Sequence, residues 1–364
     1  MLLRLYQNQK SHHHHHDHVN KTSSSSSSTT TTTLGKQSTT LETKSKTGKL
    51  TTPEEDLYSI QSESSGNGSY VSHIEHLAGP ILFSAPHGLQ VYRGGEESQD
   101  SERVHSKELY TNEICLLLSL KIKKYLGIEA SFVIWNPKTA KPKDKSNLDP
   151  NYLVASQFMS SPFHRFLHKL KKQYDGFPTL HVDIHGKINR KADRNIDIGI
   201  APMMALWKDQ KLAEKVKKDF CDRMQKAVST CKKKYSGFKL TIDRDPYLSG
   251  YWGDNTVTTI SHQSILLGMP GLQLEIPMDV RKDLMTNDDL VEQLAKAIAE
   301  SYKTSVTSIF SKEWKEVEAK LDAVKTELLS HEQTKHNSKT FDSMISQMIS
   351  EFEIIETSQK GKKI

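Results

Sequence analysis

The chain has 364 residues, a formal net charge of +6 and 35% hydrophobic residues. Its mean hydropathy of −0.60 is low for a chain that folds along its whole length, and the polar excess lies mostly near the N-terminus. The lysines are scattered over helical segments such as residues 211–234 and do not form one basic stripe interleaved with aromatic side chains, which argues against a specific nucleic-acid-binding surface. Three cysteines without CxxC spacing indicate neither a disulfide framework nor a thiolate zinc site.

No stretch of the sequence approaches eighteen consecutive apolar residues, the length that a membrane-spanning helix needs. The first six residues, Met-Leu-Leu-Arg-Leu-Tyr, lack the continuous apolar run of a signal peptide. We therefore predict a cytoplasmic protein that has no membrane segment.

The first segment, residues 1–69, is dominated by homopolymeric runs of histidine, serine and threonine within residues 12–33. Such a composition cannot bury enough apolar surface to fold, so we predict that this segment is disordered. The histidine run at residues 12–16 is typical of a repeat expansion or a cloning tag, and we assign it no function.

Residues 70–310 alternate short apolar runs with longer segments of helical periodicity. Buried strands are predicted at residues 80–84, 130–135, 180–185, 196–200, 240–242 and 271–277. Helices are predicted at residues 107–126, 161–172, 211–231 and 290–310, the first of them ending at a glycine that fits a C-cap. This alternation predicts an α/β domain whose site lies at the carboxyl ends of the strands.

The strand predicted at residues 180–185 carries an unusual set of polar side chains. Because side chains alternate along a strand, His181, Asp183 and His185 share one face. Burying them is costly unless they are paired or bound to a metal, which indicates a site at the strand end. The following glycine, Gly186, is expected to let the chain leave the sheet in a tight turn.

Residues 311–364 are predicted to form a helical extension with two heptad-like apolar stripes. The stripes fit a helical hairpin packed on the domain, or a coiled coil that binds a partner or a second copy of the chain. Neither stripe lasts for three heptads, so we favour the hairpin and keep self-association as an alternative.

Three polar side chains occupy comparable positions after strands. His87 follows the first strand in Pro-His-Gly, His185 ends the third strand, and Glu275 lies near the end of the last one. Two imidazoles and a carboxylate form the ligand set of many catalytic zinc sites, and a further carboxylate can take a proton from the activated water. Each residue alone also has an ordinary structural interpretation, as an exposed histidine or a carboxylate paired with a lysine.

In chain order, the motifs that bear these residues resemble those of the N-formylglutamate amidohydrolase family, relatives of zinc carboxypeptidases and aspartoacylase-type deacylases. They are Ser-Ala-Pro-His-Gly at 84–88, Glu-x-x-Thr-x-Glu at 108–113, Asp-Ile-His-Gly at 183–186 and Leu-Gln-Leu-Glu-Ile at 272–276. The resemblance implies a three-layer α/β/α zinc-peptidase-like domain and an amidohydrolase activity.

Carried over residue by residue, the resemblance implies that His87, Glu108 and His185 bind Zn²⁺ and that Glu275 is catalytic. Asp183 would orient a ligating histidine. The second metal position is usually Asp in this family, and Glu102 and Asp100 are alternatives to Glu108.

The resemblance also implies a substrate pocket that includes His164 and the loop at residues 245–250, with Tyr247. The family's Asp-x-Asn-Arg element occurs here as Asp-Pro-Asn-Tyr at residues 149–152, without its arginine. Arg194 and Arg244 are the substitutes that we consider for binding a substrate carboxylate.

Three functions remain open from the sequence. The first is a zinc-dependent hydrolase that cleaves the amide bond of a small N-acyl amino acid or a related carboxylated substrate. The second is a carboxypeptidase-like or deglutamylase-like peptidase that acts on a peptide. The third is a catalytically inactive hydrolase fold that serves as an interaction module.

Overall fold

The computed structural model describes residues 63–64, 70–71, 73–93, 104–140, 144, 146–188, 195–231, 240–242, 248–252, 257–332, 342–343 and 345–352. Residues 1–62, and with them the histidine run and most of the segment predicted to be disordered, lie outside the described residues. Within that segment, Glu63–Ser64 form strand β1, which pairs antiparallel with β2, Tyr70–Val71.

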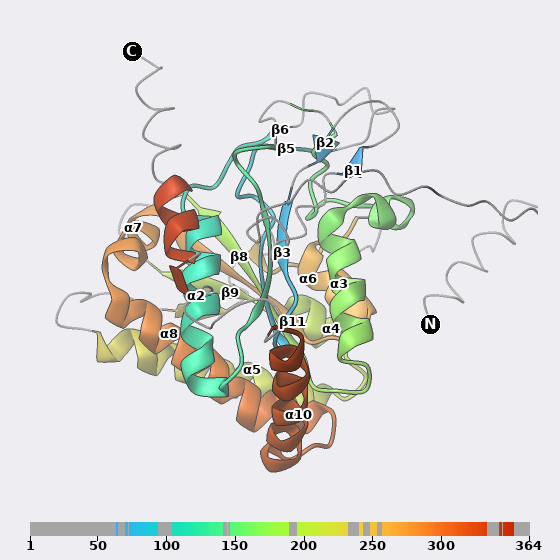
Figure 1. The fold of residues 1–364 in the computed structure, drawn as a ribbon, viewed down its shortest axis with the longest axis vertical. Helices are drawn as coiled ribbons and strands as arrows, with labels where there is room; N and C mark the ends of the chain where they lie inside the picture. The colour runs from blue at the N-terminus through green and yellow to red at the C-terminus, as the bar shows by residue number, and fades with distance from the viewer. Residues whose placement is uncertain are drawn as a thin grey trace, which may run out of the picture. The chain divides into compact units, whose positions relative to one another are not determined.

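A mixed sheet forms the middle layer of the domain (Figure 1). It has seven strands in the order β10-β9-β11-β8-β4-β7-β3. Strands β4, β7, β8 and β11 are parallel to their neighbours in this group, whereas β9 runs antiparallel to β11 and β3 antiparallel to β7. The strands are β3 His73–His76, β4 Ile81–Ala85, β7 Ser131–Trp135, β8 Leu180–Lys187, β9 Ile196–Gly199, β10 Leu240–Ile242 and β11 Gly271–Pro277. Two further short strands, β5 Val91–Tyr92 and β6 Val104–His105, pair with each other.

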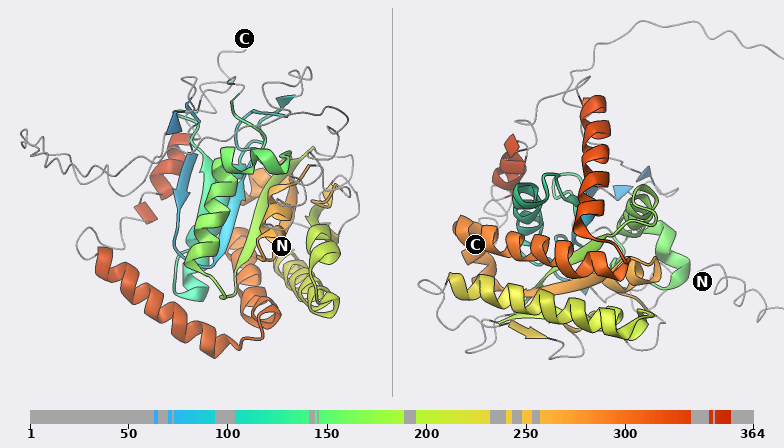
Figure 2. Two further views of the ribbon diagram at one scale, coloured as in Figure 1. Left: turned by 90° about the vertical axis from the view of Figure 1, so that its right-hand side faces the viewer. Right: turned by 90° about the horizontal axis from the view of Figure 1, so that it is seen from below.

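Helices cover both faces of the sheet, so the predicted α/β/α architecture is confirmed. Helices α2, α7 and α8 lie on one side and α3, α4 and α6 on the other (Figure 1), and α5 runs beside α8 (Figure 2). The helices are α2 Thr111–Leu126, α3 Pro162–Gln173, α4 Ala201–Leu206, α5 Gln210–Thr230, α6 Ile260–Leu266, α7 Met278–Thr286 and α8 Asp288–Ser301, with a 3₁₀ turn at Ala155–Ser160. None of the helices among the described residues is long and apolar enough to cross a bilayer.

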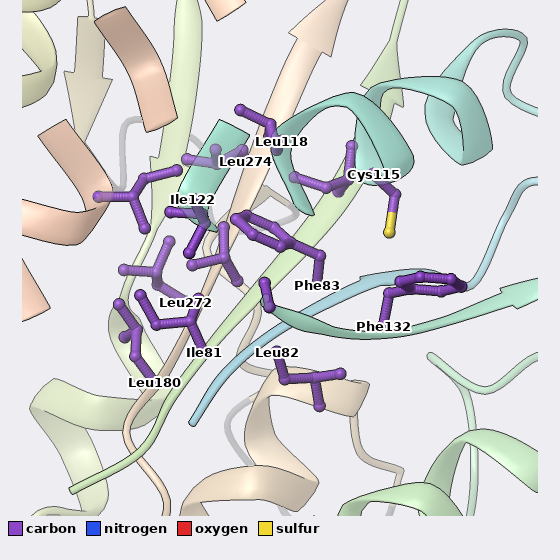
Figure 3. Close-up of a cluster of buried hydrophobic side chains, with 14 of the residues drawn as sticks. Ile81, Leu82, Phe83, Cys115, Leu118, Ile122, Phe132, Leu180, Leu272 and Leu274 are labelled. Carbon is purple, nitrogen blue, oxygen red and sulfur yellow. The ribbon is translucent and has the colours of Figure 1, made fainter. Parts of the chain in front are cut away.

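The core lies on both faces of the central strands, because these strands consist of continuous apolar runs. Phe83 of β4 faces Leu118 and Ile122 of α2, whereas Leu82 points to the opposite face (Figure 3). All four side chains are essentially inaccessible to water. The apolar side chains of these strands stabilise the sheet, and the polar residues at the strand ends are free to form a site.

Helix α2 ends at Leu126 as predicted, and Gly127 adopts the left-handed conformation, with φ of 68°. It begins at Thr111, however, four residues later than predicted. The preceding residues form a turn in which the Thr111 hydroxyl donates to the Glu108 carbonyl at 2.8 Å. This turn places Glu108 at the end of the sheet instead of within the helix.

The prediction that the chain leaves the sheet at Gly186 is wrong. Strand β8 continues to Lys187, and Gly186 pairs with Ile276 of β11. The glycine instead leaves room for the Arg281 guanidinium, since a Cβ at this position would lie 2.4 Å from its central carbon.

After α8 the chain continues through a π-helical turn at Tyr302–Val306 and α9 at Thr307–Ile309 into α10, Trp314–Glu332, and residues 345–352 are helical too. Val317 and Leu321 of the first heptad-like stripe, and Ile345 and Phe352 of the second, belong to the same buried cluster as the sheet core. These contacts favour packing on the domain over a coiled coil. Self-association stays a prediction.

Candidate metal site

Neighbouring strand ends bring together the three residues that the sequence predicted as metal ligands. Strands β4 and β8 are parallel and adjacent, with Ser84 opposite Asp183. His87 therefore follows β4 close to the point where β8 presents His185. One ligand atom each from His87, Glu108 and His185 lies within 4.8 Å of the others.

The Nδ1 atoms of the two histidines face each other across 3.1 Å. Glu108 reaches the same point, with Oε1 3.0 Å from Nδ1 of His87 and Oε2 3.5 Å from Nδ1 of His185. The two histidine side chains are almost completely removed from solvent, and the Glu108 side chain is 11% exposed. Three groups that can donate an electron pair thus converge in one buried place.

The outer nitrogens of both rings contact carboxylates. His87 Nε2 lies 2.9 Å from Asp149 Oδ1, and His185 Nε2 lies 2.7 Å from Asp183 Oδ2. These acceptors place the ring proton of each neutral histidine on Nε2 and leave the Nδ1 lone pair facing inward. Two inward lone pairs and a carboxylate fit a divalent cation, and imidazole with carboxylate is a ligand set that zinc accepts.

The surrounding carboxylates also favour positive charge electrostatically. Burial alone would lower the pKa of His87, but Asp149 and Glu108 outweigh it and raise this pKa to about 9. The pKa of His185 is likewise raised against the effect of burial, by Asp183 and Glu108. Burial would raise the pKa of Glu108, yet the two histidines hold it well below its ordinary value. A cation bound here would compete with protons for the same lone pairs.

The polar face of β8 forms a hydrogen-bonded series. The Ser84 hydroxyl donates to Asp183 Oδ1 at 2.5 Å and lies 2.7 Å from His181 Nε2. Asp183 Oδ2 in turn accepts from His185. Asp183 therefore contacts His185 in the way that the sequence analysis expected of a carboxylate that orients a ligand, and His181 lies in the interior behind it.

The Asp-Pro-Asn-Tyr segment at residues 149–152 keeps both of its polar residues at the site. Asp149 is buried and accepts from Arg93 Nε at 2.8 Å as well as from His87. Asn151 Nδ2 lies 2.9 Å from His185 Nε2, and because both groups are donors when Nε2–H points to Asp183, this is a contact and not a hydrogen bond. The amide orientation of Asn151 is set by the Ile260 N–H, which donates to Oδ1. The absent arginine is replaced by Tyr152, whose ring lies 5.3 Å from the Arg93 guanidinium.

Glu275 lies beside the cluster on the neighbouring strand. It is directly opposite His185 in the parallel pair β8–β11, so both side chains project from the same face of strands about 4.8 Å apart. Burial raises the pKa of Glu275 to about 7, and the negative charge of Glu108 acts in the same direction against the attraction of His185. A carboxyl group with this pKa can accept and return a proton near neutral pH.

Glu108 is fixed by backbone contacts on both sides. Its own N–H donates to the His87 carbonyl at 2.9 Å, and the Gly186 N–H donates to Oε2 at 2.7 Å. Two residues later Tyr110 has φ of 70°, a left-handed conformation that is uncommon for a residue with a bulky side chain. The rival acidic residues Glu102 and Asp100 lie outside the described residues.

An open cleft of about 940 Å³ leads to the cluster. Its walls contain the three predicted metal ligands and Glu275, together with further residues that the sequence did not single out for a role. The latter include Arg93, His105, Lys187, Tyr251, Trp252 and Arg281. The ring of His105 stacks on His87 at 3.8 Å between centroids, and its Nε2 lies 3.7 Å from Glu108.

Of the segments predicted to line a substrate pocket, the loop at residues 245–250 contributes Leu248 and Gly250 to this cleft, whereas His164 lies elsewhere. His164 is buried in α3, where it contacts Gln263 at 3.0 Å and His168 at 3.0 Å, and it is absent from the described cleft lining. Gln263 donates to the Pro150 carbonyl, so His164 supports the segment at residues 149–152 from behind. Arg194, Arg244 and Tyr247 lie outside the described residues.

Fold and site together define an α/β domain with a candidate metal centre made of two histidines and a glutamate. No family model and no curated protein matches the sequence. Among solved structures, the chain is similar to the zinc-free form of YNDL, with 16% identity, a TM-score of 0.33 and coverage of 64% of this chain and 89% of the other.

Two further solved structures show similarity over comparable lengths. One is a candidate metallopeptidase from Shewanella denitrificans, with 9% identity, a TM-score of 0.34 and coverage of 69% of this chain and 84% of the other. The other is an N-acetylmuramoyl-L-alanine amidase from Clostridium difficile, with 12% identity, a TM-score of 0.27 and coverage of 61% and 93%.

Proposed function

We propose that this chain is a zinc-dependent hydrolase that cleaves the amide bond of a small N-acyl amino acid or a related carboxylated substrate. The observation that carries the proposal is the convergence of His87 Nδ1, His185 Nδ1 and the Glu108 carboxylate at the floor of a cleft. A histidine pair that served only the fold would not need both outer nitrogens on buried carboxylates and both inner nitrogens facing one point.

Different residues of the site would bind the metal and transfer the proton during hydrolysis. Zinc held by His87, Glu108 and His185 would supply a Lewis acid that polarises the amide carbonyl and acidifies water. Glu275 accepts the proton of the attacking water, and the same carboxyl group donates it to the leaving nitrogen as the C–N bond breaks. Its burial and its raised pKa suit it to both steps.

Arg93 is the residue that we propose for holding the substrate carboxylate. It lines the cleft, its side chain is 27% exposed, and its only ion pair among the described residues is formed through Nε with Asp149. The two terminal nitrogens are then available to a carboxylate in the bidentate geometry that arginine favours. This assignment adds to the predictions for Arg194 and Arg244, which remain predictions.

The size of the cleft supports the peptidase alternative as well. About 940 Å³ is near the upper end of the volumes common for small-ligand sites, and it exceeds the need of a single N-acyl amino acid. A carboxypeptidase-like or deglutamylase-like enzyme would use the same zinc, base and arginine on a longer chain. Comparing N-acyl amino acids with short peptides as substrates discriminates between the two.

The metal content of the purified protein tests the proposal. The full-length chain should be used with the histidines at residues 12–16 replaced by serine, because that run would bind metal by itself. We expect one zinc per chain, and a large loss of zinc in His185→Ala. Absence of stoichiometric zinc, or its full retention in His185→Ala, would refute the site.

A further inference from the structure

Arg281 is a buried arginine beside the candidate metal centre. It lies on α7, the helix that follows the strand of Glu275, and its exposed fraction is only 3%. Its guanidinium lies over Gly186, where a Cβ would be 2.4 Å from both Cζ and Nη1. Strand β8 therefore carries a glycine directly after His185 because the guanidinium occupies the space of a side chain.

The same guanidinium connects two segments that are far apart in sequence. Nη1 donates to the carbonyl of Leu109 at 2.5 Å, directly after Glu108. Nη2 donates to the carbonyl of Lys187 at 3.4 Å, two residues after His185. Only a group with several donors in a fixed plane can reach both carbonyls at once.

The segment that holds Glu108 needs such support. Tyr110, directly after Leu109, adopts a left-handed backbone conformation with φ of 70°, and this conformation persists only where the surroundings enforce it. The contact from Arg281 to Leu109 lies next to that residue. From the other side, the Gly186 N–H donates to Glu108 Oε2 at 2.7 Å.

We propose that Arg281 is a positioning residue that sets the separation of Glu108 and His185, and through it the affinity of the site for zinc. The proposal rests on the metal site of the proposed function. Arg281 acts on the backbone next to each ligand, and Gly186 completes the arrangement by leaving room for the guanidinium and by binding Glu108.

The test measures the zinc dissociation constant by chelator competition in the full-length protein with residues 12–16 changed to serine. We expect Arg281→Ala and Gly186→Ala each to raise it about tenfold or more, as losses of groups that orient metal ligands do. The clash in Gly186→Ala is with the guanidinium itself. The zinc dissociation constant of the double variant should therefore stay within about twofold of that of Arg281→Ala alone. The effects of the two substitutions on zinc binding would then not be additive in free energy.

Two further proteins separate positioning from general destabilisation. Arg281→Lys keeps the charge but not the planar pair of donors, and we expect it to lose zinc affinity while its circular dichroism stays native. Free guanidinium at millimolar concentration should restore part of the affinity of Arg281→Ala. Arg223→Ala, which removes a half-exposed arginine paired with Asp219, is the matched control and should bind zinc like the wild type.

The outcomes are distinguishable. A wild type that binds no zinc would refute the proposed function and this inference with it. If the wild type binds zinc and folded Arg281→Lys binds it equally well, the site stands and the role of Arg281 is wrong. Multiplicative effects of Gly186→Ala and Arg281→Ala would also overturn it, because the glycine would then act independently of the guanidinium.

Discussion

Replacing Asp149 by Asn tests whether the carboxylates behind the histidines serve the metal. Asp149 Oδ1 accepts from His87 Nε2 at 2.9 Å and from the Asn151 N–H at 2.9 Å, and Oδ2 accepts from Arg93 Nε at 2.8 Å. An amide can keep the first two contacts through its oxygen, but its NH₂ group would face the Arg93 donor. The substitution therefore removes the negative charge behind His87 and leaves the ring in place.

The expected magnitude follows from these contacts. Loss of a carboxylate behind a metal-binding histidine lowers zinc affinity about 10- to 100-fold, or about 1.4 to 2.8 kcal/mol. The free energy of unfolding of the zinc-free protein should fall by about 3 to 5 kcal/mol where His87 is protonated, because the substitution removes one partner of a buried ion pair.

Chelator competition gives the affinity, and urea unfolding of the zinc-free protein gives the stability. Asp149→Asn also lowers the pKa of His87 and so weakens proton competition, which is why the comparison belongs near pH 9, the pKa of His87 in the parent protein. Asp175→Asn is the control, since it removes an exposed carboxylate paired with Lys171. Unchanged zinc affinity in Asp149→Asn would show that the contact to His87 serves the fold alone.

Three more predictions concern other groups. Glu275→Gln should retain zinc and lose about 10²- to 10⁴-fold in kcat. In the parent protein, kcat/KM should decrease as the pH falls below about 7, because Glu275 becomes protonated. A Glu275→Gln enzyme that keeps its turnover would remove Glu275 from the mechanism. Arg93→Ala should raise KM for carboxylated substrates at least tenfold and leave their amidated analogues unaffected, and equal changes for both would exclude carboxylate binding by Arg93. Burial would raise the pKa of Glu75, but His73 and Lys169 hold it below the ordinary 4.5. The stability that Glu75 contributes is thus complete above about pH 4.5 and lost as the pH falls through its lowered pKa. In Glu75→Gln, the free energy of unfolding measured with urea should therefore decrease less steeply as the pH is lowered. An unchanged acid dependence would contradict this assignment.

The sequence predicted the middle of the sheet because its strands bury apolar side chains on both faces. Residues 81–85, 131–135 and 271–277 needed only local pattern and composition to be identified. Strand β3 escaped detection because His73–His76 contains two histidines and a glutamate. It lies at the sheet edge, where pairing with β7 and contacts such as His76 with Glu129 compensate for its poor local propensity.

For the site, the sequence supplied the residue types but not the contacts between distant segments. His87, Glu108 and His185 could be named because each belongs to a motif. Arg93 and His105 belong to none, and they reach the cluster only through short strands whose pairing depends on the whole fold. The role predicted for Gly186 was wrong because the space beside this residue is taken by Arg281, which lies almost a hundred positions away in the sequence. A local sequence pattern does not show that a guanidinium packs against a strand.

The polar face of β8 shows why three metal-capable residues on one buried strand do not define three ligands. His181 contacts Ser84 through Nε2, while its Nδ1 is buried without a hydrogen-bond partner among the described residues, and Asp183 accepts from Ser84 and from His185. His185 uses its outer nitrogen on Asp183 and keeps Nδ1 directed at His87 and Glu108. Burial of a polar strand face costs least where the groups have partners, so the group that still faces other electron-pair donors marks the candidate position for a cation.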